Sequence, residues 1–430
     1  MHFSEVWLEA RSRFLAAENY ERARIITKDV SNLFVQWALY DDVIRLNEEI
    51  LEHEQHPRPM RSLGRAHLEQ ADYEKAVEWY RDAAEEAENR NQNELASARH
   101  GLATIALNQG HYEEARKEFS EVLRVRQEIG DQSGEASARH QLASIAIKQG
   151  DHEEARKDLK ELTQISQEIG DQSGEASARH QLATIALEQG DYEEARKGFE
   201  EVLRLHPDGE GSTRHQLASV ALEQGDYEEA RKGFEEALRI CQEIGDQNGE
   251  EAARSQLAKV ALEQGEYEEA WKRSMEALQI RREIGDRRGE GSTRHQMARI
   301  ALKQGSYREA LEEFEEALRI RQEIGDRIGE AMTFDQLGIL ASKIDNKVGA
   351  LRFHLLALLF LDQIGHAHQE AAQINVTSRA SELGLSEEEL ENATQKVRNC
   401  YDEDRGWSLI QGAFPDVDIP DNIPSRGDSD

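Results

Sequence analysis

Two neighbouring stretches of the chain are nearly identical. Residues 131–159 read DQSGEASARHQLASIAIKQGDHEEARKDL, and residues 171–199, which begin 40 positions later, read DQSGEASARHQLATIALEQGDYEEARKGF. The phrase recurs with drift along the chain, and one alanine marks each copy: Ala76, Ala115, Ala155, Ala195, Ala230, Ala270, Ala310 and, in a worn copy, Ala350. The spacings are 39, 40, 40, 35, 40, 40 and 40 residues. A fixed period of this length is typical of repeat proteins, in which each unit packs on its neighbours.

Each repeat is predicted to form two helices joined by a tight turn. In the fourth repeat, Leu182 and Ala186 lie on an apolar stripe at helical spacing. Gly190 is suited to end that helix, and Asp191 to cap the next one. Ala195 lies on the apolar face of the second helix, where only a small side chain lets two helices approach closely. A bulky residue there is expected to overpack the pair, at a cost of about 1–3 kcal/mol.

One family carries this pattern of residues. The matching positions in the fourth repeat are Leu182, Ala183, Ala186, Gly190, Tyr192, Ala195 and Phe199. They resemble the tetratricopeptide repeat, and the 40-residue form is similar to repeats of kinesin light chains, of spindle-orientation adaptors and of the sensor region of bacterial STAND signalling ATPases, without the ATPase. The resemblance implies an all-α fold, a right-handed α-solenoid (superhelix) of stacked antiparallel helix pairs.

The chain divides into four predicted parts. Residues 1–56 are expected to form an N-terminal helical capping region, and residues 57–362 form eight tetratricopeptide-type repeats. Residues 363–401 are expected to form C-terminal capping helices, with Ser386 as an N-cap. Residues 402–430 are acidic and contain three prolines, so we expect a mostly disordered tail.

The amino-acid composition excludes some classes of binding partner and of site. Asp and Glu outnumber Lys and Arg by 86 to 53, which gives a formal net charge of −33. Such a surface repels nucleic-acid phosphates and anionic membranes. The only cysteines, Cys241 and Cys400, form no CxxC motif, so neither a disulfide framework nor a cysteine zinc site is expected. The start of the chain has acidic residues where a signal peptide needs an apolar core. We therefore expect a cytoplasmic protein that binds neither nucleic acid nor membrane.

The resemblance implies that the first helix of each pair lines a concave groove. A polar ladder of histidine, glutamine and small hydroxyl residues occupies the predicted groove positions, and glutamine can both donate to and accept from the main chain of an extended peptide. Arginines and lysines stand at the two ends of the ladder. The candidate residues for binding a protein segment or peptide are Arg61, Arg65, His100, Thr104, His140, Gln141, Ser144, His180, Gln181, Thr184, His215, Gln216, Ser219, Gln256, Lys259, His295, Gln296, Arg299 and Lys303.

The terminal cations allow two interpretations. They could dock acidic side chains or a terminal carboxylate of the ligand through charge-assisted bonds. They could equally balance nearby glutamates, since most surface charges contribute little. The sequence alone leaves both open.

The histidine column is not expected to bind a metal. Neighbouring first helices lie about 10 Å apart, whereas the ligands of one zinc ion must converge to about 2 Å from it. The recurrence of histidine at this position is better explained by duplication of the repeat, which copies the same residue into each unit. Five arginines that precede ladder positions each follow a glutamate by four residues, which predicts a helix-surface ion pair in each case: Arg139, Arg179, Arg214, Arg254 and Arg294. No nucleotide-binding, nucleophile-elbow or metalloprotease motif occurs, so we expect no catalysis, metal or cofactor.

Two further segments could contact other surfaces. The apolar run 351–361 is expected to be a helix buried by the closing pair; the alternative is a partner surface that includes Phe353, Leu356, Leu359 and Phe360. The tail 402–430 carries an apolar-acidic strip that could dock back into the groove or on another protein. Deleting it would then raise ligand affinity.

The sequence thus predicts a non-enzymatic adaptor or sensor that binds a protein segment in its groove. The alternatives are a receptor for a short signalling peptide, or a regulatory subunit that recruits or inhibits a partner enzyme. The identity of the partner and the oligomeric state do not follow from the sequence.

Overall fold

A computed structural model of the chain describes residues 2–88, 90–206, 210–364 and 369–414. Throughout these ranges the regular structure is α-helical, without strands. The chain forms two compact units, Met1–Asp208 and Gly209–Asp430, here called the N-terminal and C-terminal units. The fold is therefore all-α, as predicted.

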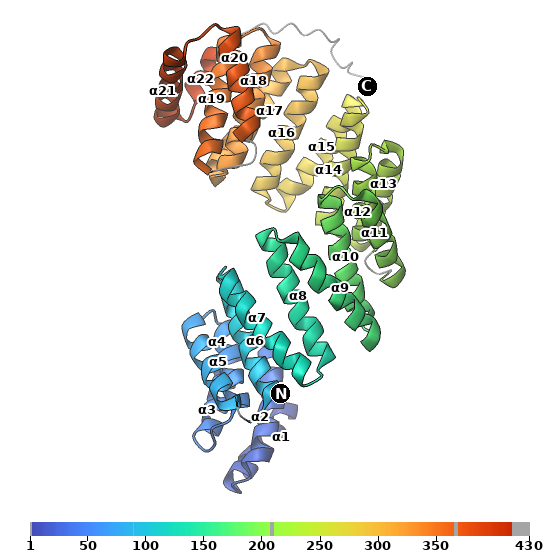
Figure 1. The fold of residues 1–430 in the computed structure, drawn as a ribbon, viewed down its shortest axis with the longest axis vertical. Coiled ribbons are helices and arrows are strands. Elements are labelled where there is room, and N and C mark those ends of the chain that lie inside the picture. Colours follow the sequence, from blue (N-terminus) through green and yellow to red (C-terminus); the bar gives the residue numbers. More distant parts are fainter. Residues whose placement is uncertain (1, 89, 207–209, 365–368, 415–430) are drawn as a thin grey trace. The chain divides into compact units, whose positions relative to one another are not determined.

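The N-terminal unit is a stack of antiparallel helices, coloured blue to green in Figure 1. From α4 onward, each even-numbered helix pairs with the helix that follows it, and within the unit this second helix packs against the first helix of the next pair. The helices are α1 (His2–Ala16), α2 (Tyr20–Gln36), α3 (Tyr40–Leu51), α4 (Pro57–Glu69), α5 (Tyr73–Ala87), α6 (Gln92–Asn108), α7 (Tyr112–Glu128), α8 (Gln132–Gln149), α9 (His152–Ile169), α10 (Gln172–Glu188) and α11 (Tyr192–Leu205).

The C-terminal unit continues the same pairing from α12 to α19 and closes with three further helices. Its helices are α12 (Glu210–Glu223), α13 (Tyr227–Ile244), α14 (Gln247–Glu263), α15 (Tyr267–Glu283), α16 (Arg287–Gln304), α17 (Tyr307–Ile324), α18 (Arg327–Lys343), α19 (Lys347–Ile364), α20 (Gln369–Glu382), α21 (Glu387–Asp404) and α22 (Trp407–Ala413).

The predicted helix boundaries follow from local chemistry. Between α10 and α11, Gly190 adopts φ +79°, a left-handed conformation that is strained for residues with a Cβ. Asp191 then accepts a hydrogen bond from the amide of Glu194 at 3.2 Å and caps α11. The cap predicted at Ser386 is also confirmed, as a capping box with Glu389.

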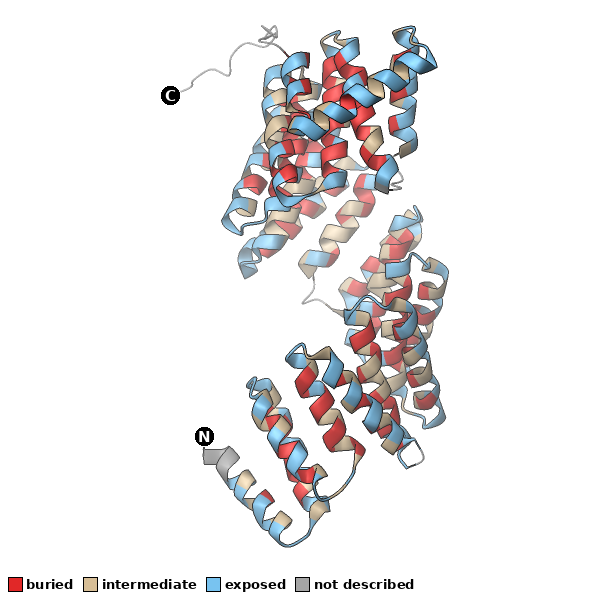
Figure 2. Cartoon of the chain, turned by 90° about the vertical axis from the view of Figure 1, so that its left-hand side faces the viewer, coloured by how far each residue is buried: buried red, intermediate tan, exposed pale blue. Residues whose placement is uncertain are grey.

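The core runs between the paired helices. Figure 2 shows buried residues on the inner faces of the hairpins and exposed residues on their outer faces. Ala195 is completely buried, and in four of the eight repeats a fully buried phenylalanine follows the marker alanine by four residues. These fully buried rings are Phe119, Phe199, Phe234 and Phe314.

The arginines that precede the ladder histidines bridge the two helices of a hairpin. In α8, Arg139 contacts Glu135 at 3.0 Å, which is the predicted pair on the same helix. It also contacts Asp158 at 3.0 Å and Glu161 at 2.5 Å on α9. The sequence analysis found only the first of these contacts. Because Arg139 is nearly buried, this cluster is a structural link between α8 and α9 and not an exposed surface pair.

The apolar run at the end of the repeats is buried, so the alternative of an open partner surface is wrong. Phe353, Leu356 and Phe360 are at most 8% exposed, and the half-buried Leu359 packs against the same core. The helices α18, α20, α21 and α22 pack around α19 and cover its apolar run.

The start of the predicted tail also differs from expectation. Residues 402–414 are mostly helical, and Leu409 and Ile410 are buried in the core around α19. The Trp407 indole donates to Gln322 at 3.1 Å. The neighbouring Asp402 and Glu403 stay exposed, so the apolar side chains are buried without desolvating these carboxylates. The strip docks on its own chain, but on α17 and α19 instead of the predicted ladder residues. Residues 415–430 lie outside the described residues.

Candidate functional site

The ladder histidines lie against the second helix of their own hairpin. Four of the five ladder histidines, all but His140, meet a phenylalanine edge to face, with ring centroids 5.0–5.5 Å apart. Such pairs contribute about 0.5–1.5 kcal/mol beyond their buried area. The pairs are His100 with Phe119, His180 with Phe199, His215 with Phe234, and His295 with Phe314. These histidines therefore help to hold the hairpins together, in addition to bordering the first-helix face.

Burial keeps these histidines neutral. It lowers the pKa of His100, His180 and His215, because a charged imidazolium loses its hydration there. The pKa of His295 falls to about 3, through burial first and then through the positive charges of Arg321 and Arg299. The rings can exchange hydrogen bonds with a ligand but carry no charge at neutral pH.

A sequence signal for this packing was missed. The paired histidine and phenylalanine are 19 residues apart in each of these four repeats. Where the phenylalanine is replaced by Ser274, the histidine is replaced by Ser255. In the third repeat, by contrast, His140 is kept while Leu159 replaces the phenylalanine, so the spacing alone hints at the contact and the structure establishes it.

The small hydroxyl residues of the ladder are already satisfied. Each donates to the carbonyl of the residue four positions earlier on its own helix, at 2.8–2.9 Å. This geometry uses up the hydroxyl proton and leaves only acceptor capacity for a ligand. The residues are Thr104, Ser144, Thr184 and Ser219.

The ladder glutamines are the available hydrogen-bonding groups. Gln181 contacts His140 of the preceding first helix at 3.1 Å. The other four glutamines are half-buried, and the structure records no hydrogen bond to their side chains from any described residue. They are Gln141, Gln216, Gln256 and Gln296.

The cations of the ladder divide into paired and unpaired groups. Three of them have nearby glutamates: Arg61 with Glu94 at 3.1 Å, Lys259 with Glu223 at 3.0 Å, and Lys303 with Glu263 at 3.8 Å. For these three cations, the interpretation that they balance nearby glutamates of the protein holds. Arg65 and Arg299 are exposed, and neither forms an ion pair with any described residue.

A pocket of about 530 Å³ lies on the first-helix face of the C-terminal unit. It is formed by α14, α16, the end of α17 and the start of α18. Five predicted ladder residues line it: Gln256, Lys259, His295, Gln296 and Arg299. The other charged lining residues, which the repeat pattern did not predict, are Glu263, Arg288, Arg321 and Asp326. The remaining ladder residues of this unit lie on α12, and Lys303 lies at the end of α16.

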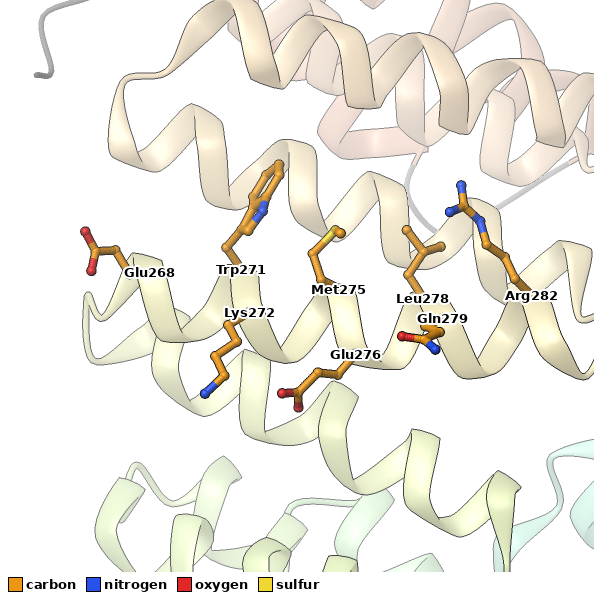
Figure 3. Close-up of a pocket in the computed structure, with 8 residues that line it drawn as sticks. All are labelled: Glu268, Trp271, Lys272, Met275, Glu276, Leu278, Gln279 and Arg282. Atoms are coloured by element: carbon orange, nitrogen blue, oxygen red, sulfur yellow. The ribbon is translucent and has the colours of Figure 1, made fainter. Parts of the chain in front are cut away.

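A second hollow of about 950 Å³ follows α15 alone. Figure 3 shows Trp271, Met275 and Arg282 along one edge of α15, with Lys272 and Glu276 on the other side. Met275, which is 47% exposed, replaces a glutamate found in the preceding and following second helices. This hollow is less polar than the first-helix face and offers fewer groups for recognising a backbone.

The described residues form neither a metal site nor a membrane span. No group of three or more His, Cys, Asp and Glu side chains is arranged to hold a metal ion. No described helix has both the length and the apolar character required to cross a bilayer.

Comparison with solved structures identifies similar folds. The quorum sensor NprR from B. thuringiensis, in its apo form, matches 78% of this chain and 97% of its own, with 15% identity and a TM-score of 0.57. A STAND signal transduction ATPase with a tetratricopeptide repeat sensor, from Pyrococcus horikoshii, matches 88% of this chain and 56% of its own, with 17% identity and a TM-score of 0.51. A putative kinesin light chain from Podosopora anserina matches 45% of this chain and 99% of its own, with 20% identity and a TM-score of 0.39.

Comparison with families and curated sequences completes the assignment. No curated protein sequence matches significantly. The family described as tetratricopeptide repeat matches residues 94–161, 134–208, 210–283 and 289–358, and a second family with the same description matches residues 38–91. These matches cover most of the chain and coincide with the observed helix pairs. The chain therefore belongs to the tetratricopeptide repeat proteins.

Proposed function

We propose that the chain is a non-enzymatic adaptor or sensor that binds an extended protein segment along the first-helix face of its repeats. The observation that carries this proposal is the row of half-buried glutamine amides without partners. Gln256 and Gln296 sit one repeat apart and line the same pocket. Each amide offers both a donor and an acceptor, which suits the alternating groups of a peptide backbone.

The charges around this pocket support a ligand with acidic groups. Arg299 has no ion pair among the described residues, although the protein as a whole is strongly acidic. An unpaired cation in such a protein attracts an anionic ligand group more selectively than a paired one does. Nucleic acid is disfavoured as the ligand, because the net charge of −33 opposes phosphate backbones.

A receptor for a short peptide is the second candidate. The pocket of about 530 Å³ favours it, because small-ligand sites measure roughly 300–1,000 Å³. The two candidates differ in the length of chain bound and not in the chemistry of recognition. A regulatory subunit that recruits or inhibits a partner enzyme would use the same face.

We place the protein in the cytoplasm. Both cysteines are free, Cys241 being buried and Cys400 half-buried. Unpaired thiols are typical of a reducing compartment.

Capture followed by titration tests the proposal. The full chain and a Gln256→Ala/Gln296→Ala variant are used as baits, and captured proteins are identified by mass spectrometry. Peptides from a captured protein are then titrated calorimetrically. Losing two hydrogen bonds should weaken binding about tenfold.

The matched control is Gln279→Ala, a glutamine on the outer side of α15. It should leave the titration unchanged. Equal binding by the double variant and the wild type would exclude the glutamine ladder as the binding face, and weakening by the control alone would assign binding to the α15 hollow.

A further inference from the structure

Arg321, at the end of α17, is a buried guanidinium without a carboxylate partner. The residue is 5% exposed. Its Nη1 lies 2.5 Å from the hydroxyl of Thr333, 2.7 Å from the carbonyl oxygen of Gly329 and 3.2 Å from Nδ1 of His295. Its Nε has no hydrogen-bond partner, and no described carboxylate forms an ion pair with it. Asp326, at the same register as Asp131 and Asp286, attracts the guanidinium without forming an ion pair with it. A buried cation that lacks a direct carboxylate contact is still costly, so its charge requires an explanation.

The equivalent arginines of other repeats are neutralised. Arg281, 40 residues earlier, contacts Glu251 at 2.7 Å. Arg126, in the second repeat, contacts Asp131 at 2.8 Å. In the repeat of Arg321, the position of Glu251 is occupied by Gly291. The carboxylate that completes the site one repeat earlier is therefore missing.

The pocket around Arg321 has an excess of positive charge. Arg288 and Arg299 line it and form no ion pair with described residues, and Lys259 lines it with Glu223 nearby. Two carboxylates face the pocket, and both have roles. Asp326 accepts from the amide of Gly329 at 3.1 Å and caps α18, and Glu263 lies 3.8 Å from Lys303.

The imidazole of His295, which contacts Arg321, is also affected by the positive charge of the pocket. Burial is the main cause that lowers the pKa of His295 to about 3, and the positive charges of Arg321 and Arg299 lower it further. A neutral His295 adds no charge to the pocket but can accept from the guanidinium.

We propose that this pocket binds a carboxylate of an acidic peptide, with Arg321 as the buried partner and Arg288 and Arg299 as exposed ones. The ligand would supply the group that Glu251 supplies to Arg281 inside the protein. The inference rests on the proposed function, since it names the chemistry of the segment that the groove binds. Guanidinium groups pair with carboxylates in a planar, charge-assisted geometry, which gives selectivity over neutral ligands.

Fluorescence polarisation with short labelled peptides tests this directly. Three probes separate the sources of the carboxylate: hexaglutamate amide carries only side-chain carboxylates, hexaglutamine acid only the terminal one, and hexaglutamine amide none. The full chain should bind one or both acidic probes more tightly than the neutral probe, and added salt should weaken this binding. Inorganic phosphate is added as a competitor.

The decisive variant is Gly291→Glu, which places a carboxylate at the register of Glu251. A Cβ at Gly291 would meet Ile320 Cγ2 at 3.3 Å and Arg321 Cγ at 3.6 Å, so the new side chain starts beside the aliphatic stem of Arg321. The matched control is Gly211→Glu, at the same register of α12, where the neighbour is Cys241 instead of arginine. Both add one negative charge to the same unit.

We expect Gly291→Glu to weaken hexaglutamate binding about tenfold or more and Gly211→Glu to change it little. Equal weakening by both variants would reduce the effect to general charge and overturn the inference, as would undiminished binding by Gly291→Glu. Should Gly291→Glu melt abnormally, the exposed double variant Arg288→Gln/Arg299→Gln replaces it, and unchanged binding again overturns the inference.

The remaining outcomes separate this inference from the proposed function. Failure of wild-type protein to bind any acidic probe overturns the carboxylate pocket, whereas capture of a partner that depends on Gln256 and Gln296 would still support the groove. Binding of phosphate in preference to both acidic probes would reassign the pocket to another anion and also overturn the inference.

Discussion

Acidification should destabilise the C-terminal unit through His295. The folded state holds this imidazole neutral with a pKa of about 3, whereas an unfolded chain gives histidine a pKa near 6.5. Because the folded pKa is the lower one, the contribution of His295 to stability is complete above about pH 6.5. It is lost progressively as the pH falls toward 3, since the unfolded state takes up the proton first.

The size of this effect follows from the burial of the ring. His295 is 8% exposed, so solvent screening is small. At about pH 5 the histidine is protonated in the unfolded chain but not in the folded one. This pH lies about 1.5 units below the pKa of the unfolded histidine. At about 1.36 kcal/mol per unit, this lowers the free energy of unfolding by about 2 kcal/mol.

Hydrogen exchange of α16, α17 and α18, measured at about pH 8 and pH 5, checks the prediction after correction for intrinsic exchange rates. A His295→Gln variant removes the titrating group but keeps a polar side chain. It should lose about 2 kcal/mol less stability on acidification than the wild type, and other titrating groups cancel in this comparison. NMR of the His295 ring gives the direct control: a titration midpoint near pH 6 would refute the reasoning, because the ring would then be hydrated.

Three further changes have expected outcomes. Ala195→Leu should lower the free energy of unfolding by about 1–3 kcal/mol in urea, because the fully buried site has no room; an unchanged midpoint would mean that the helices separate freely. Arg139→Leu should cost about 3–5 kcal/mol, since Asp158 remains buried without its partner, and adding Asp158→Leu should recover much of the loss in the same assay. Deleting residues 402–430 should lower the melting temperature by exposing the core around α19; equal melting with higher ligand affinity would support the original interpretation of the tail as a pseudo-ligand.

The ladder was predictable as a set of positions but not as a set of roles. Repeat spacing placed His295, Gln296 and Arg299 on one helix, and they do line one pocket. Their roles depend on what each side chain faces, which spacing along one helix does not reveal. The histidine turns partly toward Phe314, the glutamine remains free, and the arginine lacks a partner.

Arg321 shows why the rest of the site could not be found from the sequence. It belongs to a second helix, where the resemblance implies no ligand contact, and its sequence context matches that of Arg281. Only the packing of α16 against α17 reveals that Gly291 stands where a carboxylate neutralises the earlier arginine.

By itself, the sequence determined the all-α architecture, the helix pairs, the turn at Gly190 and the cap at Ser386. Each of these depends on local backbone chemistry and on a period repeated often enough to exclude chance. Only the tertiary structure decided that the run around Phe353 is covered, that the strip at Leu409 packs onto α19, and which cations remain unpaired. Burial and charge pairing depend on residues far apart in the chain that meet only after folding, so they cannot be read from any single segment.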